Sequence, residues 1–435
     1  ANAEEDFALG GYRDRLVVEL AQNAADAALR AGVPGRLRLT LRDGVLYAAN
    51  VGAPLDAAGV ESLCTLRASA KKDDIGAAGR FGVGFAAVVS VTDTPAIMSR
   101  ATGGVRWSRA ETAELVAARP ELAEELARRD GHVPLLRLPF PVEDLEVPEG
   151  FDTVVRLPLR DEAAEQAVRR MLDEASPALP IALPALERIE IEVDGRCRTI
   201  TAEGWRVVTA SGEFTPEQVA ELFADRPTEE RARPYWSVRW AVPETPGRLP
   251  EDVAPVVYAP TPSDEPLDLP ALLIATLPMA TDRRHVAPGP LADFLVERAA
   301  ETYLELLRTL PRTPDLLKLV PGLIGKGELD AAIRRAVLRR LPDTPLLPVL
   351  SPPAEGGYPA EGPVPGRLAV VVDGPAEFLA RIAPLVPGLL PAGWPYRSPA
   401  LTALGVRRIE LADVIDLLSG DAVADKDPAW WRSLY

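Results

Sequence analysis

Apolar side chains near the start of the chain recur with the period of an α-helix. Leu16, Leu20 and Ala24 lie on one stripe of residues 12–30, a stretch that contains no proline. This spacing is typical of an amphipathic helix with one face against a core. Gly32 follows and is a typical terminator. We therefore predict a helix over residues 12–30.

The next apolar positions alternate with polar ones, which is the period of a β-strand. Residues 36–42, RLRLTLR, alternate strictly, and residues 45–50, VLYAAN, supply a second apolar segment. Asp43 and Gly44 between them are a two-residue hairpin signal, because both residue types tolerate a positive φ. The pattern predicts an antiparallel hairpin.

Helices and strands continue to alternate up to about residue 165. The expected elements are helices over residues 56–66, 81–91 and 111–129, a polar loop over 67–79, and strands over 94–100, 104–109, 135–139 and 153–159. This mixture favours an α+β domain with a mixed sheet.

Two further segments are expected after this domain. A helix over residues 162–174 precedes several short strands, and residues 290–310 form a long amphipathic pattern. We expect domains over residues 1–165, 166–310 and 311–435, the second a further α/β domain. The third is expected to be an α/β segment that continues in a longer protein.

Composition narrows the class of protein. With 47% hydrophobic and 26% charged residues the chain is typical of globular proteins. It has no apolar run near the roughly 20 residues that a membrane helix needs, and its start lacks a signal-peptide pattern, so a soluble cytoplasmic protein is expected. The net charge of −16 argues against nucleic acid as the main ligand. Two cysteines and two histidines are too few for a disulfide framework or a multi-histidine metal centre.

The predicted first helix also carries three polar residues on one face. Glu19, Asn23 and Asp26 stand at positions i, i+4 and i+7. A carboxylate at such a position can activate water as a general base, and an amide oxygen one turn along can bind Mg²⁺. Taken alone, the same residues also fit an exposed polar stripe on an amphipathic helix.

Three later motifs add to this face. Asn50 and Gly52 follow a strand, where glycine permits a close approach of the backbone to a flat ring or a tight turn. The segment GRFGVGF places three glycines before an apolar run, a pattern that exposes backbone N–H groups to phosphate. Thr153 begins a late strand, where its hydroxyl could reach the edge of a base. Each motif alone also fits an ordinary turn, loop or strand.

Taken in order, the four motifs resemble the GHKL, or Bergerat-fold, ATPase superfamily. The closest similarity is to the heat-shock-ninety chaperones and the sacsin N-terminal ATPase-like proteins, and it covers residues 7–165. The resemblance implies a two-layer α/β-sandwich ATP-binding domain, with ATP and Mg²⁺ as its cofactors. Where most of the superfamily has an aspartate that accepts from the adenine amine, this chain has Asn50.

The resemblance also implies roles for individual residues. Glu19 matches the water-activating base, Asn23 the Mg²⁺ ligand, and residues 66–78 a short lid. The expected contacts to the nucleotide are Asn23, Asp26, Asn50, Gly52, Leu55, Lys71, Gly79, Arg80, Phe81, Gly82, Val83, Gly84, Phe85 and Thr153. A weaker similarity to a chaperone middle domain in residues 275–307 implies that Arg283 or Arg284 assists catalysis near the γ-phosphate; a salt-bridged loop is the alternative.

Four functions remain open from the sequence. The first is a slow, Mg²⁺-dependent ATPase with chaperone-like closure, which binds ATP and ADP, acts on a client or partner that the sequence does not name, and is compatible with a homodimer. The second is a nucleotide-gated binding module with negligible hydrolysis. A DNA-acting GHKL ATPase fits the acidic charge poorly. A histidine kinase fits least, since no upstream helical phosphoacceptor histidine is present.

Overall fold

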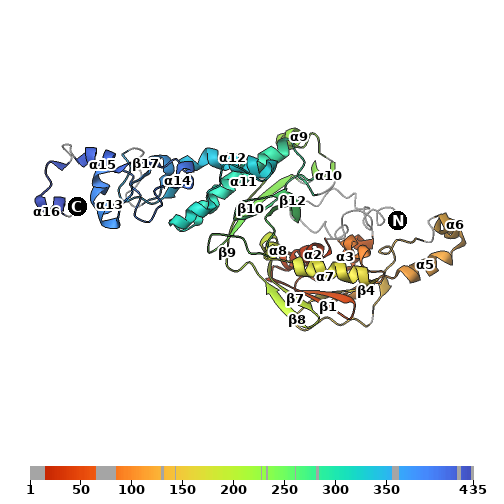
Figure 1. The fold of residues 1–435 in the computed structure, drawn as a ribbon. Coiled ribbons are helices and arrows are strands. Elements are labelled where there is room, and N and C mark those ends of the chain that lie inside the picture. The colour runs from red at the N-terminus through yellow and green to blue at the C-terminus, as the bar shows by residue number, and fades with distance from the viewer. Residues whose placement is uncertain are drawn as a thin grey trace. The chain divides into compact units, whose positions relative to one another are not determined.

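The computed structural model describes most of the chain (Figure 1). The described ranges are 15–64, 85–128, 132–142, 144–226, 228–231, 234–259, 261–280, 284–354, 362–418 and 423–432. The chain divides into two compact units, one ending at Glu203 and the other beginning at Gly204. Each unit is described by itself.

The first unit is built on a mixed eight-stranded sheet. Its strands are β1 (Gly35–Arg42), β2 (Val45–Asn50), β3 (Ala96–Ser99), β4 (Gly103–Arg106), β5 (Phe140–Pro141), β6 (Thr153–Pro158), β7 (Leu186–Val193) and β8 (Arg196–Ile200). Their order is β5-β4-β3-β6-β2-β1-β7-β8. All neighbours pair antiparallel except β1 and β7, which are parallel.

The predicted hairpin is confirmed as β1 and β2. Asp43 and Gly44 have φ angles of 51° and 70°, so both adopt the left-handed conformation that a tight two-residue turn needs. The alternation of β1 then places Leu37, Leu39 and Leu41 on the buried face of the sheet. The polar positions between them face the other way.

Helices pack against this buried face (Figure 1). The helical elements of the unit are α2 (Leu16–Ala31), α3 (Ala57–Cys64), the 3₁₀ helix η1 (Phe85–Ser90), α5 (Arg109–Ala117), α6 (Pro120–Arg128), α7 (Glu162–Glu174) and α8 (Ala178–Ala182). α2 inserts its apolar stripe, including Leu16 and Leu20, into the same core as the β1 leucines. The expected α+β class with a mixed sheet is therefore confirmed.

Two expected elements are wrong. The charged helix predicted over residues 111–129 is two helices, because α5 ends at Ala117 and α6 begins at Pro120. Proline lacks an N–H and disfavours helical geometry in the residue before it, so the charge pattern continues while the helix does not. The strand predicted over residues 135–139 is a turn, in which Leu135 and Leu136 are fully buried.

The first compact unit also extends beyond residue 165, where we expected its domain to end. β7 adds to the sheet beside β1, with Leu39 opposite Ile191, and β8 follows as its antiparallel neighbour. α7 lies before these strands and contributes Val168 and Leu172 to the same core. Residues 166–203 therefore belong to the first unit, and β7 and β8 extend its sheet.

The second unit contains a five-stranded sheet and a long helix. The strands are β9 (Trp205–Glu213), β10 (Tyr235–Pro243), β11 (Val256–Tyr258), β12 (Pro262–Pro266) and β13 (Leu272–Ala275), in the order β12-β11-β13-β10-β9. The expected long helix is present as α11 (Pro290–Thr309). Trp240 of β10 donates its Nε1–H to the Ala299 carbonyl of α11 at 2.8 Å and packs on Tyr303.

Short elements complete the second unit. They are α9 (Pro216–Leu222), α10 (Thr228–Arg231), η2 (Pro314–Leu319), α12 (Glu328–Arg340), η3 (Leu341–Asp343), β14 (Pro345–Leu347), β15 (Val364–Pro365), η4 (Gly366–Leu368), β16 (Val370–Val371), α13 (Ala376–Ile382), η5 (Ala383–Leu385), α14 (Pro399–Ala403), β17 (Arg407–Arg408), α15 (Leu411–Leu418) and α16 (Pro428–Arg432). A single apolar cluster runs from Phe214 to Leu404. The boundary expected at residue 310 falls inside that cluster. None of the helices in the described part combines the length and apolar character needed to cross a membrane.

Candidate functional site

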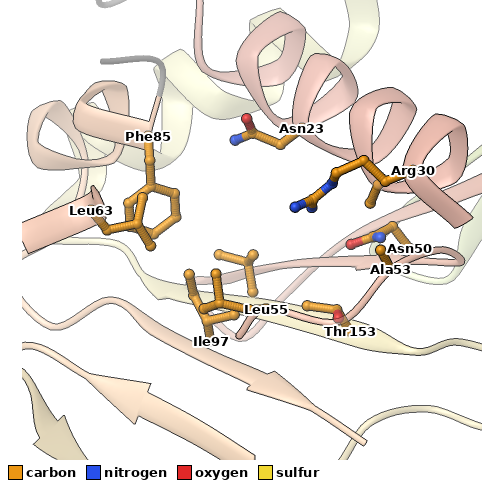
Figure 2. Close-up of a pocket in the computed structure, with 11 residues that line it drawn as sticks. Asn23, Arg30, Asn50, Ala53, Leu55, Leu63, Phe85, Ile97 and Thr153 are labelled. Atoms are coloured by element: carbon orange, nitrogen blue, oxygen red, sulfur yellow. The ribbon is translucent and has the colours of Figure 1, made fainter. Parts of the chain in front are cut away.

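A hollow lies between α2 and the sheet of the first unit (Figure 2). It has a volume of about 440 Å³, which includes space open to solvent. Its lining residues are Asn23, Ala27, Arg30, Asn50, Ala53, Leu55, Leu63, Phe85, Ile97, Thr153 and Val155. Segments that are distant in the sequence therefore meet at one place.

Two polar residues of the floor, Asn50 and Thr153, lie on neighbouring strands, and Ser99 of the next strand is buried beside Thr153 in the same polar row. In the register of the sheet, Thr153 of β6 lies opposite Asn50 of β2 on one side and opposite Ser99 of β3 on the other. Directly opposite residues present their side chains on the same face of a sheet. The Ser99 and Thr153 hydroxyls are 2.7 Å apart, and Ser99 Oγ accepts from the Leu55 N–H at 3.0 Å. Ser99 therefore holds both Thr153 and the backbone of Leu55 in place.

The next row of the floor is apolar. Val155 of β6 lies opposite Ile97 of β3, two residues along each strand from the polar row. Leu63 and Phe85, both almost fully buried, add further apolar surface to the wall. A flat ring could pack on this surface and still present one edge to the polar row, because apolar surface gains by leaving water.

The opposite wall of the hollow is one face of α2. Asn23, Ala27 and Arg30 line it at positions i, i+4 and i+7. Figure 2 shows the Asn23 amide above the floor and the Arg30 side chain reaching in from the end of the helix. An amide oxygen and a guanidinium thus enter the hollow from one wall.

The backbone of the turn after β2 packs directly against the backbone of α2. Gly52 has a φ of +143°, and a Cβ at this position would lie 2.5 Å from the Ala27 carbonyl carbon and 2.6 Å from its oxygen. The neighbouring Ala53 N–H donates to the Ala27 carbonyl at 2.9 Å. The Gly52 N–H donates to Asp152 Oδ2 at 2.8 Å. Glycine is therefore required here for contact between two backbone segments.

Several predicted site residues converge on the hollow. Asn23, Asn50, Leu55, Phe85 and Thr153 all line it. Glu19 and Asp26 lie on α2, partly exposed, and are not among the lining residues. Gly52 lies in the turn that contacts α2 and is not among the lining residues. The other predicted site residues of the first unit, the lid and Arg283 lie outside the described residues, namely Lys71, Gly79, Arg80, Phe81, Gly82, Val83, Gly84, Arg283 and residues 66–78.

Arg284 belongs to the second unit and is paired there. Its Nε lies 2.9 Å from Asp264 Oδ2 of β12, and its backbone carbonyl accepts from the Asp264 N–H at 2.8 Å. This is the salt-bridged arrangement that the sequence left open as an alternative. A role for Arg284 toward phosphate stays a prediction.

Some residues of the site are missing from the sequence prediction. Arg30 continues the spacing of Asn23 by seven residues, so the helical period used for Glu19 could have found it. Ser99 becomes part of the site only through its register with Thr153. Asp152 carries no sequence signal for its contact with Gly52, since that contact depends on how the β2 turn meets the start of β6.

An ion-pair cluster fixes the segment that follows η1, the element that carries Phe85. Asp93 accepts from Arg109 Nε at 2.7 Å and from Arg160 Nε at 2.8 Å, and Arg160 also donates to the Val89 carbonyl. Burial raises the pKa of Asp93, but the hydrogen bonds from Arg160 and then Arg109 outweigh it, so its pKa lies below the ordinary 3.8. The ionised carboxylate therefore stabilises the folded unit.

Asp93→Asn is expected to lower the free energy of unfolding by about 1 kcal/mol at pH 7, a modest value because the pair is partly exposed to solvent. Since the folded pKa is depressed, this stabilisation is present above about pH 4 and is lost as the pH falls through the folded value. Thermal unfolding of the wild type and the variant from pH 7 to pH 3 tests this. Asp173→Asn, at an exposed site on α7, is the control. A difference that stays constant across this range would contradict the role of the charge.

The expected magnesium site can be compared with the residues present. Mg²⁺ keeps several waters and takes few protein oxygens when phosphates also bind it, so the Asn23 amide oxygen in the wall of the hollow fits the requirement. Within the described ranges, no three His, Cys, Asp or Glu side chains form a metal cluster.

Comparison of this sequence with protein families and with curated proteins finds no match.

Proposed function

We propose that the first unit binds ATP with Mg²⁺ and hydrolyses it slowly, as a GHKL-type module of Bergerat fold. The observation that carries this proposal is the convergence of Asn23, Asn50 and Thr153 on one hollow. These residues come from three motifs that are far apart in the sequence. Such convergence of polar groups over an apolar floor is typical of small-molecule sites.

The base of the nucleotide would lie on the apolar row of Val155 and Ile97. Its polar edge would meet Asn50 and Thr153, whose hydroxyl is held by Ser99 at 2.7 Å. The phosphates would extend toward Asn23 and the glycine-rich segment that precedes η1. Glycine-rich segments suit phosphate because glycine lets backbone N–H groups approach the phosphate oxygens closely.

Hydrolysis would use Glu19, one helical turn before Asn23. Its carboxylate would accept a proton from water while the water oxygen bonds to the γ-phosphorus and the bond to the β–γ bridging oxygen breaks. When bound, Mg²⁺ would neutralise charge on the phosphate oxygens, and Asn23 would hold it through its amide oxygen. Such sites are usually completed by closure of a lid, so slow turnover is expected.

Asn23→Ala is expected to weaken binding of Mg-ATP tenfold or more, because the metal loses its protein ligand. In EDTA the variant and the wild type should bind ATP with similar affinity. Isothermal titration calorimetry with and without Mg²⁺ measures both. Gln22→Ala is the matched control, since it removes a neighbouring amide that does not line the hollow. Unchanged Mg-ATP affinity in Asn23→Ala would rule out the ligand role.

A second candidate is a nucleotide-gated binding module with negligible hydrolysis. Asn50 favours it, because an amide at the base edge carries no charge to hold an adenine amine. Phosphate release by the wild type, measured against a Glu19 variant, separates the two candidates.

A further inference from the structure

We propose that the hollow accepts 6-oxopurine nucleotides, such as inosine and guanosine triphosphate, at least as well as ATP. The inference rests on the proposed function, because it concerns the base end of the same nucleotide site. It follows from three observations: the amide of Asn50, the absence of a carboxylate from the described lining, and the entry of Arg30.

The first observation concerns hydrogen bonding at Asn50. Adenine presents a donor at its 6-amino group and an acceptor at N1, whereas a 6-oxopurine presents an acceptor at O6 and a donor at N1. An ionised carboxylate only accepts, so it favours the adenine amine and repels O6. A carboxamide has one donating and one accepting end and exchanges them by a half turn about its terminal bond. Asn50 can therefore pair with either edge.

The surroundings of Asn50 do not force one orientation. The Asn50 Nδ2–H contacts the Val51 carbonyl at 3.5 Å, which is long for a hydrogen bond. In the same row, the Thr153 hydroxyl, which pairs with Ser99, can donate or accept. The neighbouring carboxylate, Asp152, accepts from the Gly52 N–H through Oδ2 and is not among the lining residues. No described residue that lines the hollow carries a carboxylate.

The third observation is the charge that Arg30 brings. Arg30 lies seven residues after Asn23, about 10 Å farther along α2, which takes it away from the expected phosphate end. Figure 2 shows its side chain extending into the space between Asn23 and Asn50. A guanidinium only donates, and O6 with N7 is its most common target on a base. The positive charge therefore favours a carbonyl over an amine at this end.

Calorimetry with Mg-ATP, Mg-ITP and Mg-GTP tests the proposal. ATP and ITP differ only at position 6 and the N1 proton, so their ratio isolates the edge that faces Asn50. For the wild type we expect ITP to bind as tightly as ATP or tighter. In Asn50→Asp, ITP should weaken at least tenfold relative to ATP, because the carboxylate repels O6.

Arg30→Met provides a second test. Arg30 is exposed, so this variant should fold normally. We expect it to lower the affinity for ITP relative to ATP several-fold. Arg170→Met, which removes the same charge from an exposed position on α7, should leave the ratio unchanged. A wild type that binds ATP more tightly than ITP, beyond the error of the measurement, overturns the inference, as does an unchanged ratio in Asn50→Asp. If no triphosphate binds, the proposed function itself fails, and this outcome is distinct from a preference for ATP.

Discussion

Gly52→Ala is expected to lower the free energy of unfolding of the first unit by about 3 kcal/mol and to abolish nucleotide binding. The added Cβ would lie 2.5 Å from the Ala27 carbonyl carbon and 2.7 Å from the Ala28 nitrogen, both backbone atoms of α2. Neither atom can move without displacing the helix that carries Asn23 and Arg30. The φ of +143° adds strain for any residue with a side chain.

Urea unfolding followed by circular dichroism measures the loss of stability, and calorimetry measures nucleotide binding. Gly150→Ala is the matched control, because Gly150 also has a positive φ, of +79°, but its Cβ would meet nothing within 4 Å. It should cost about 1 kcal/mol, the penalty for the backbone conformation alone. Equal effects of the two substitutions would show that the contact with α2 is unimportant.

Glu19→Ala is expected to reduce ATP hydrolysis by a factor of about 100 or more while leaving Mg-ATP affinity within a few-fold of the wild type. A general base typically contributes a factor of about 100 to 10,000. Binding should persist because Glu19 is not among the residues that line the hollow, whereas Asn23 and Thr153 are. Phosphate release under single-turnover conditions, together with calorimetry, measures both quantities.

Glu174→Ala, which removes an exposed carboxylate at the end of α7, is the control for the loss of negative charge. Unchanged hydrolysis in Glu19→Ala would remove Glu19 from the mechanism. If the wild type itself binds ATP but releases no phosphate above the level of the variant, the module gates binding rather than turning over. Phosphate release and calorimetry together therefore distinguish slow hydrolysis from nucleotide-gated binding.

Local structure in the first unit followed well from sequence pattern. The stripe that includes Leu16 and Leu20 predicted the first helix, and α2 is described from Leu16 to Ala31. The alternation of β1 and the Asp43-Gly44 turn predicted the hairpin, since both residue types tolerate the positive φ that a tight turn needs. The prediction for residues 162–174 is also confirmed, as α7. Local patterns succeed here because local contacts decide these elements.

Secondary structure was predicted wrongly in two places, where a single residue or contacts distant in the sequence determine the backbone conformation and the periodic pattern of side chains does not. The helical pattern of charged residues over 111–129 continues across Pro120, although one helix ends before this residue and another begins at it. Leu135 and Leu136 read as part of a strand but are buried in a turn. Apolar side chains mark what is buried without specifying which backbone conformation buries it.

The sequence by itself determined the helix that bears Glu19 and Asn23, the hairpin, and the order of motifs that suggested a nucleotide site. Only the tertiary structure placed Ser99 opposite Thr153 in the sheet. It also brought the Asp152 carboxylate to the Gly52 N–H, and it placed Arg30 in the same hollow as Asn50. It also joined β7 to β1 across more than a hundred residues. The physical reason is that alternation and helical period specify which face of an element is buried. The partner and register on that face are chosen by packing of the whole unit, and register set the polar row of the candidate site.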